Sequence, residues 1–336
     1  MGTQPTDLEA PPSDEDVHVR ALTEMLKARM TRDYPSGTMK RDAHPKHHGL
    51  ARAKFEVDAG LPSDLGVGLF AEPKTFDAWI RFSNASGHAQ PDATRDVRGL
   101  AIKLFDVPGT KLLPGSEEAT THDLLLITAD RFPSRDVESF RHLVQAMLDG
   151  GIHVALHMLT HPCEAYRAFV GSVVIGSVLD TLYTSPTPYL LGTRAVRYRL
   201  RPHKSSPAEK PTTPTPDFLR DELRKRLIDG DAAFDFMIQL QTDPHKMPVE
   251  DPTVVWDENL SPYRKVGTLR IPPQTPDSDD RMSLAENLSF NPWRCLAEHR
   301  PLGGINRARK VIYPTLSGYR HDKNGVPIAE PKEPPR

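Results

Sequence analysis

The sequence is poor in cysteine, and this scarcity excludes two classes of protein. Among 336 residues, the only cysteines are Cys163 and Cys295, which lie far apart in the chain. Two distant cysteines do not form the disulfide framework of a small secreted domain, and no CxxC pair supplies the thiolate spacing of a metal site. Neither a disulfide-stabilised scaffold nor a cysteine-based metal centre is therefore expected.

An excess of charge of either sign is also lacking. The formal net charge is -2 at pH 7, with acidic and basic residues mixed along the chain. Proteins that bind nucleic acid or an anionic membrane surface carry clustered basic residues, so this balance gives no electrostatic case for either partner. A small-molecule substrate is the better expectation.

Long hydrophobic segments are absent as well. The longest apolar run, "AFVGSVVIGSVL" at 168–179, has 12 residues and is too short to cross a bilayer. The first residues, "MGTQPTDLEAPPSDED", are acidic and rich in proline, without the basic and apolar regions of a secretory signal. The expectation is a cytoplasmic protein without stable membrane insertion.

Proline, by contrast, is abundant, with 33 residues, and its distribution suggests the domain limits. Prolines gather near the N-terminus, in 203–216 and after 325, where the sequence has little to bury. We expect a disordered tail over 1–16, a single domain over 17–321 with an exposed loop at 203–216, and a C-terminal tail over 322–336.

The periodicity of the remaining sequence predicts an α+β fold. A helix is indicated at 14–35, where acidic residues precede helically spaced apolar residues and basic residues follow. Helices are also predicted at 137–151, 163–183 and 302–313. Short alternating or apolar runs predict strands at 53–61, 66–86, 97–109, 122–132, 194–202, 232–243, 254–259 and 263–273. Strands and helices do not alternate regularly, which favours an antiparallel barrel over a parallel sheet.

Three clusters carry residues suited to chemistry, and the first is "RDAHPKHHG" at 41–49. It contains Arg41, His44, His47 and His48. A lone histidine is more often structural than catalytic, and no carboxylate or cysteine stands at the spacing that would complete a metal site. The second cluster spans 79–106, where Arg81 and Ser83 end one predicted strand and "RDVRGLAIK" begins the next. A salt-bridge network among Arg95, Asp96 and Arg98 is the simple interpretation there.

The third cluster is "INRARKVIYPTLSGYRH" at 305–321, in which Arg309, Tyr313 and Arg320 share one face of a predicted helix. A tyrosine has a pKa near ~10, and nearby cations lower it by roughly one to three units. A tyrosinate is a ligand for ferric iron and the proximal haem ligand of catalases. A solvated basic helix is the alternative interpretation.

Taken in order, these segments resemble the haem catalase superfamily, particularly its short, catalase-related branch. The resemblance covers about 35–321. It is carried by "RDAHPKHHG", "RFS" at 81–83, "RDVRGLAIK", "RD" at 135–136 with Phe140 after it, "FNPWRCLAEHRPLGGINRAR" at 290–309, and the RxxxY of 309–313. It implies an antiparallel eight-stranded β-barrel with flanking helices and a haem b cofactor.

The resemblance also implies roles for individual residues. His44 matches the distal histidine above the haem iron, and Ser83 matches the serine that bonds its ring. Tyr313 matches the proximal ligand, with Arg309 as its activating partner. The residues that match haem-contacting positions are three arginines facing the propionates, Arg41, Arg81 and Arg320, and two apolar residues lining the distal side, Phe132 and Phe140. His47 and His48 match no such position.

One departure bears on the reaction. Large catalases carry a distal asparagine where this chain has Ile127 and Thr128. That amide helps to position peroxide while the histidine acts as general base and then general acid. A threonine hydroxyl replaces one hydrogen bond and has a shorter reach, so haem binding is the firmer expectation and hydrogen peroxide dismutation the weaker one. Pro133, after Phe132, replaces a second phenylalanine of many relatives.

The leading hypothesis is a haem peroxidase or catalase-like enzyme that reduces hydrogen peroxide or an organic hydroperoxide through a ferryl intermediate. One alternative is rearrangement of a fatty-acid hydroperoxide, as in catalase-like allene oxide synthases. The other is a haem-binding protein without enzymatic activity. A homodimer is a possible assembly, because the short relatives lack the extensions that entwine the subunits of the large catalases.

Overall fold

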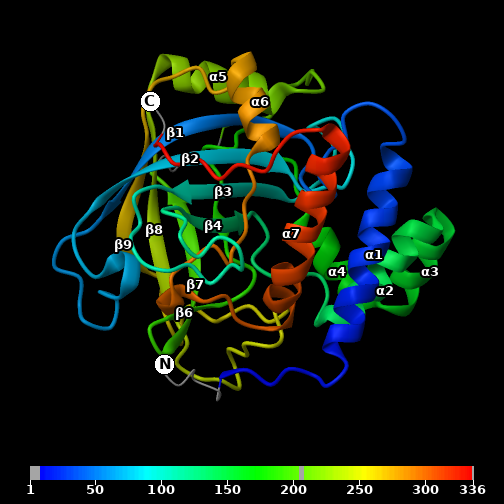
Figure 1. The fold of residues 1–336 in the computed structure, drawn as a ribbon, viewed down its shortest axis with the longest axis horizontal. Coiled ribbons are helices and arrows are strands. Elements are labelled where there is room, and N and C mark those ends of the chain that lie inside the picture. Colours follow the sequence, from blue (N-terminus) through cyan, green and yellow to red (C-terminus); the bar gives the residue numbers. More distant parts are fainter. Residues whose placement is uncertain (1–7, 204–207, 335–336) are drawn as a thin grey trace.

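The computed structural model describes residues 8–203 and 208–334, and its centre is a closed antiparallel barrel (Figure 1). The eight strands pair around the ring in the order β5, β4, β3, β2, β1, β9, β8, β7, and β5 pairs with β7 to close it. Their bounds are β1 His47–Val57, β2 Thr75–Asn84, β3 Arg98–Leu104, β4 His122–Ile127, β5 Tyr183–Thr184, β7 Arg194–Pro202, β8 Ala232–Leu240 and β9 Arg264–Ile271. A short strand, β6 (Tyr189–Leu191), pairs with β7 outside the ring. The predicted fold class, an α+β eight-stranded barrel, is confirmed.

The barrel interior is the main hydrophobic core, and the period of two along each strand explains its composition. On β2, Phe82 and Ile80 are completely buried in this core, whereas Arg81 and Ser83 alternate with them on the outer face. The interior is mainly apolar, with buried polar pairs such as Tyr198 Oη and His299 Nδ1 at 3.2 Å, and Arg81 and Ser83 face the outside of the barrel wall.

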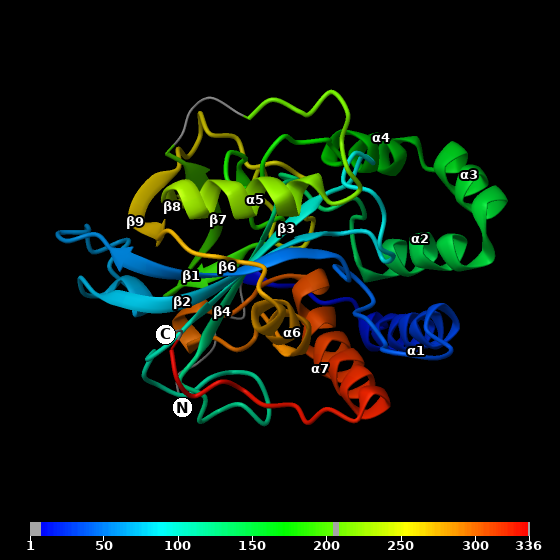
Figure 2. The same cartoon turned by 90° about the horizontal axis from the view of Figure 1, so that it is seen from above.

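The described part of the chain contains seven α-helices: α1 Glu15–Asp33, α2 Val137–Asp149, α3 Gly151–Thr160, α4 Pro162–Gly171, α5 Phe218–Asp229, α6 Asp279–Asn287 and α7 Gly304–Asn324. Single 3₁₀ turns lie at η2 (Gly68–Phe70) and η3 (Ala297–His299). Helix α5 packs its leucines onto the main core, while α1, α2 and α7 pack together beside the barrel around a second core (Figures 1 and 2). None of the described helices is both long and apolar enough to cross a bilayer.

Two predicted elements are wrong. The helix predicted over 163–183 ends at Gly171, and its last residue, Tyr183, begins β5. The run at 254–259 is no strand, because the Asp251 and Asp257 side chains accept backbone N–H groups two residues ahead and form turns instead. Helices α5 and α6 lie in segments for which no helix was predicted.

The chain ends are held more firmly than their composition suggests. Helix α1 begins at Glu15, two residues before the expected domain limit, and Glu9 pairs with Arg300 and Arg307. At the other end, α7 continues to Asn324, and Glu330 pairs with Lys103 at 2.5 Å and Arg294 at 3.1 Å. Residues 208–216 of the expected loop contain no helix or strand and are mostly exposed, and 204–207 lie outside the described residues.

The Glu330 contact belongs to a buried charge cluster around Asp123, which predicts a large effect of one substitution. Asp123 accepts hydrogen bonds from Lys103 and Arg294, and both Asp123 and Lys103 are almost completely buried. Asp123→Asn leaves buried cations short of a counter-charge, so we expect the free energy of unfolding to fall by about 3–5 kcal/mol. Urea denaturation of both proteins measures this difference.

The matched control is Asp77→Asn, whose partner Lys54 is largely exposed. Exposed ion pairs contribute about 0–1 kcal/mol, so the control should barely move the urea midpoint. Equal shifts for the two variants would show that the buried cluster contributes no more than a surface pair.

Candidate active site

His44 occupies an unusual backbone conformation between α1 and β1. Its φ is 60°, in the left-handed region that side chains other than glycine rarely adopt, at a cost of about 1–3 kcal/mol. Two contacts hold it there: Nη2 of Arg81 donates to the His44 carbonyl at 2.9 Å, and the His44 N–H donates to the Ala85 carbonyl. Strand β2 thus fixes the backbone that presents this imidazole.

The His44 ring is oriented by two neighbouring strands. Its Nδ1 lies 3.0 Å from Oγ of Ser83, at the end of β2. Ser83 pairs with Gly99 of β3, and a Cβ added at Gly99 would lie 2.5 Å from Cε1 of His44. The glycine therefore leaves the space that the imidazole occupies.

His44 is held as a neutral imidazole. Burial lowers its pKa to about 3, and the positive charges of Arg81, Arg309 and Arg41 add to this effect. A neutral ring has a free nitrogen lone pair and can accept a proton near neutral pH. This is the protonation state that a general base requires.

Three arginines converge on the C-terminal end of α6. Arg41 and Arg81 each donate to the Ala285 carbonyl at 3.1 Å, and Arg320 donates to the Glu286 carbonyl at 2.5 Å. The last carbonyls of a helix lack intrahelical donors and carry partial negative charge, so they attract guanidinium groups. Residues from three distant parts of the chain thus meet at one helix end.

Glu286 is the carboxylate that pairs with these cations. Its Oε1 lies 3.5 Å from Arg320 and 3.8 Å from Arg41, and its Oε2 lies 3.3 Å from Lys40. Burial raises its pKa, but the contacts with His47, Arg41 and Lys40 outweigh this and lower the pKa well below the usual range. Burial and mutual repulsion with Arg81 and Arg320 lower the pKa of Arg41. One carboxylate cannot balance three arginines, so a net positive charge remains buried at this helix end.

Tyr313 and Arg309 lie together on α7, one turn apart. The Arg309 guanidinium carbon is 5.9 Å from the centroid of the Tyr313 ring. Two completely buried residues hold the guanidinium, which donates to Thr187 Oγ1 at 3.2 Å and to Asn306 Oδ1 at 3.0 Å. Because Arg309 also acts electrostatically on His44, it connects the tyrosine with the histidine.

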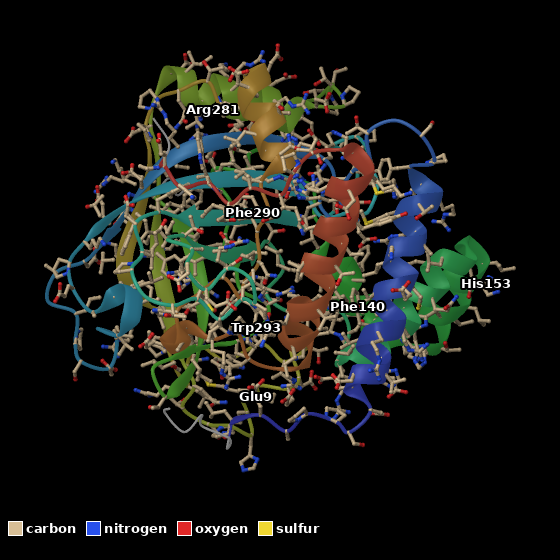
Figure 3. The ribbon with its side chains drawn as sticks, in the orientation of Figure 1. Glu9, Phe140, His153, Arg281, Phe290 and Trp293 are labelled. Carbon is tan, nitrogen blue, oxygen red and sulfur yellow. The ribbon has the colours of Figure 1, made fainter. Side chains whose placement is uncertain are left out.

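Phe132 and Phe140, the two predicted apolar residues of the distal side, contact each other. Phe132 and Phe140 meet edge to face, with ring centroids 5.0 Å apart. Both pack, like Tyr313, against the second core formed by α1, α2 and α7, and Figure 3 shows Phe140 beside these helices. One hydrophobic cluster therefore supports all three aromatic side chains.

Thr128 takes part in the strand end rather than in the histidine cluster. Its Oγ1 accepts the Arg98 N–H at 2.9 Å, and its own N–H donates to the Arg98 carbonyl. The hydroxyl keeps one proton to donate and supplies no amide. No hydrogen bond joins it to His44 or Ser83 within the described residues.

The remaining candidates have structural partners. His47 lies 3.6 Å from Glu286. The side-chain oxygen Oδ1 of Asn84 bonds both His48 and the buried Arg98. The predicted surface network of Asp96 and Arg98 is instead largely buried, with the two ends 3.7 Å apart. Arg307, which one would place on a solvated face, binds the carboxylates of Glu9, Glu15 and Glu250.

Four functional residues were not predicted from the sequence. Glu286 stands at no regular spacing from its arginine partners, so the sequence gives no sign of the pairing. Thr187 and Asn306 are polar residues of no recognisable motif, and only the fold places them around Arg309. Gly99 lies in the "RDVRGLAIK" motif, so its position was visible but its contact with His44 was not. A glycine inside a strand is the one sequence signal that points to a close approach.

Comparison with known proteins gives one curated relative and several solved structures. No family model matches the chain. The catalase-related peroxidase of Mycolicibacterium paratuberculosis (strain ATCC BAA-968 / K-10) is 31% identical over 261 residues, covering 71% of this chain and 76% of the relative.

The solved structures share the fold at low sequence identity. A fungal catalase superposes with a TM-score of 0.68 at 18% identity, over 98% of this chain and 67% of that one. A bacterial catalase gives 0.69 at 16% identity, with 98% and 66% covered, and catalase A of Saccharomyces cerevisiae gives 0.68 at 17%, with 98% and 70% covered. The chain thus spans about two thirds of these catalases.

The space beside Gly99 predicts a specific displacement. In Gly99→Ala the new methyl group would stand 2.5 Å from His44 Cε1 and 3.0 Å from Ser83 Oγ, so the ring must rotate away. We expect the hydrogen bond between His44 and Ser83 to be lost while the barrel stays folded. A crystal structure of the variant measures the Nδ1–Oγ distance.

Gly318→Ala on α7 serves as the control, because a Cβ there meets nothing within 4 Å. Alanine favours a helix by about 0.5–1 kcal/mol over glycine, so this variant should be at least as stable as the parent. An unchanged distance of about 3 Å in Gly99→Ala would contradict the role assigned to the glycine.

Proposed function

The chain belongs to the catalase-like superfamily, and on that premise we propose that it is a haem-dependent peroxidase acting on hydrogen peroxide or an organic hydroperoxide. The observation that carries the proposal is the neutral, oriented imidazole of His44 beside a buried excess of positive charge. A base without a proton and a cradle for an anionic group are what peroxide chemistry on a haem requires.

The arginine cluster fits a dicarboxylate group. Arg41, Arg81 and Arg320 bring three positive charges to a place where Glu286, which also pairs with the partly exposed Lys40, supplies one negative charge. Two propionates would balance the remainder, and planar guanidiniums bind carboxylates in a bidentate manner. Charge counting therefore supports haem, and the type proposed is haem b.

Tyr313 is the residue proposed to ligate the iron through its phenolic oxygen. Arg309, whose guanidinium carbon lies 5.9 Å from the centroid of the Tyr313 ring, is proposed as its activating partner. Thr187 and Asn306 hold Arg309 in place through uncharged oxygen atoms, which do not neutralise its positive charge. Phe132 and Phe140 would supply the apolar contacts of the macrocycle.

The proposed chemistry of this chain is a proton transfer at His44. When bound, haem supplies the electrons that cleave the O–O bond. His44, with Nδ1 bonded to Ser83, accepts the proton of the hydroperoxide at Nε2 and returns it to the departing oxygen. The oxygen leaves as water or as an alcohol, and an organic reductant restores the resting enzyme.

Reduction of peroxide by an external donor is proposed as the main activity, with dismutation of hydrogen peroxide as the weaker one. Thr128 Oγ1 already accepts the Arg98 N–H, and the side chain offers no amide to a second peroxide. A second peroxide molecule must be positioned as the reductant in dismutation, whereas an organic donor does not need that distal contact. Oxygen evolution, measured beside donor oxidation, separates the two reactions.

Haem binding through Tyr313 is the central test. Protein expressed with haem supplied should show a haem absorption band and oxidise a phenolic donor with peroxide. Tyr313→Phe should lose the band or shift it, because phenylalanine offers no ligand to iron. Visible spectra of the two purified proteins measure this difference.

Tyr319→Phe is the matched control on the same helix, since its hydroxyl contacts Thr31 at 2.7 Å and is placed in no catalytic role. It should keep the spectrum and the activity of the parent. A haem-free parent protein, or a Tyr313→Phe spectrum identical to the parent spectrum, would refute the assignment.

The low pKa of His44 predicts a flat pH profile. An ordinary histidine becomes protonated near pH 6.5, but burial holds the His44 pKa at about 3, and burial persists when propionates neutralise the arginines. The base is then competent throughout the range from about pH 5 to 8. We expect kcat/KM for the peroxide to vary less than about twofold across this range at constant ionic strength. An acidic limb with an apparent pKa close to 6.5 would contradict this prediction.

A further inference from the structure

Helix α3 stands at the tip of an arm that projects from the body of the protein. Its main contacts are with α2 and α4, the helices before and after it in the chain. Figure 2 shows this arm extending away from the barrel, with α3 at its outer end. In Figure 3, His153 of α3 lies at the edge of the molecule. The helix is therefore open to a partner.

The composition of α3 does not suit an exposed helix. Its sequence, GIHVALHMLT, contains no aspartate, glutamate, lysine or arginine, and none of its residues is buried. A helix that is apolar on most sides is normally covered by other parts of a protein. Within the described residues nothing covers the outer face of α3, so its cover must come from elsewhere.

The exposed face of α3 is a single apolar stripe. Ile152, Leu156 and Leu159 are 79%, 59% and 78% exposed, and the small, exposed Ala155 lies between them. The spacing i, i+3, i+4, i+7 places all four on one side of the helix. The inward face carries Val154, which is half-buried.

The apolar surface of the arm is large for a monomer. Half of the large hydrophobic residues that are exposed in the described chain fall within 147–170, and besides the stripe they are Met147, Tyr166, Phe169 and Val170. Summed over the arm they expose on the order of 700 Å², about half of it from the α3 stripe, whereas each partner buries roughly 800 Å² in a standard interface. A second protein surface of similar character would fit this area.

We propose that this stripe is the interface of a homodimer, in which α3 packs antiparallel against α3 of a second copy. The stripe is symmetric about its midpoint. With the two-fold axis between positions 155 and 156, Ile152 faces Leu159 of the partner subunit, and Ala155 faces Leu156 of the partner subunit. An isologous interface needs this self-complementarity, because residue i must meet j while j meets i. The alanine lets the two helices approach closely.

Charge argues against a lipid surface as the occupant. Helices that lie in a membrane interface carry lysine and arginine on their polar side to meet anionic headgroups. Helix α3 has neither, and the whole chain has a net charge of -2. An uncharged stripe is instead what the centre of a protein interface requires.

Sedimentation velocity of the full-length protein, from low to high micromolar concentration, tests the proposal. The parent should sediment as a dimer, and Leu156→Arg should raise its dissociation constant at least about a hundredfold, because a charge at the centre of an apolar interface stays unpaired. Ile228→Arg is the matched control: its side chain is 55% exposed on α5, away from the arm, and dimerisation should be unchanged. Circular dichroism of each variant confirms that it is folded.

Cross-linking provides a second readout that needs no charge substitution. In a Cys163→Ser background, Leu156→Cys lies beside the two-fold axis and should form a disulfide-linked dimer on mild oxidation, whereas Ile228→Cys should not. A parent protein that stays monomeric, or a dimer that Leu156→Arg leaves intact, would overturn the proposal. Flotation of a monomeric parent with neutral phosphatidylcholine vesicles, lost in Leu156→Arg, would assign the stripe to a lipid surface instead.

Discussion

The concentration of buried positive charge at the end of α6 is the constraint on which the site depends. Guanidinium groups resist deprotonation even when buried, so the fold cannot relieve their repulsion by removing protons. Burial nevertheless lowers the pKa of Arg81 to about 10, a sign of how strongly the surroundings disfavour the charge. The cluster persists because helix carbonyls and Glu286 offset part of it. The positive charge that they do not offset favours the binding of an anion at this place.

The same cluster determines the state of His44. Arg81 holds the histidine carbonyl, which stabilises the left-handed backbone, and its charge helps to keep the ring neutral. One guanidinium thus positions the base and adds to the effect of burial, which keeps the ring neutral. Ser83 acts from the same strand, two residues on, so that the period of a β-strand links the contact to the backbone with the contact to the ring. Both contacts come from a strand of the barrel wall, which fixes the position of the imidazole.

How far the sequence predicted this arrangement depends on the distance over which each signal acts. The alternation around Phe82 and the one-turn spacing of Arg309 and Tyr313 are local patterns, and the structure contains the strand and the helix that they indicate. Glu286 could not be predicted, because its partners Arg41 and Arg320 lie on either side of it in the chain and meet it only in the folded protein. The helix predicted beyond Gly171 failed for a related reason: an apolar run of that length fits a helix or buried irregular chain equally well.

The arginines of α7 show why a local pattern alone does not assign a role. Arg307 and Arg309 are separated by two residues and therefore point in different directions around the helix. Arg307 meets three carboxylates, which neutralise it and fasten the N-terminal segment to the domain. Among the described residues, Arg309 donates hydrogen bonds only to neutral oxygens, so its charge is not neutralised and helps to lower the pKa of His44. The partners of each arginine thus determine what its charge can do: the carboxylates around Arg307 neutralise it, whereas the neutral pair Thr187 and Asn306 leaves Arg309 charged for the role proposed for it beside Tyr313.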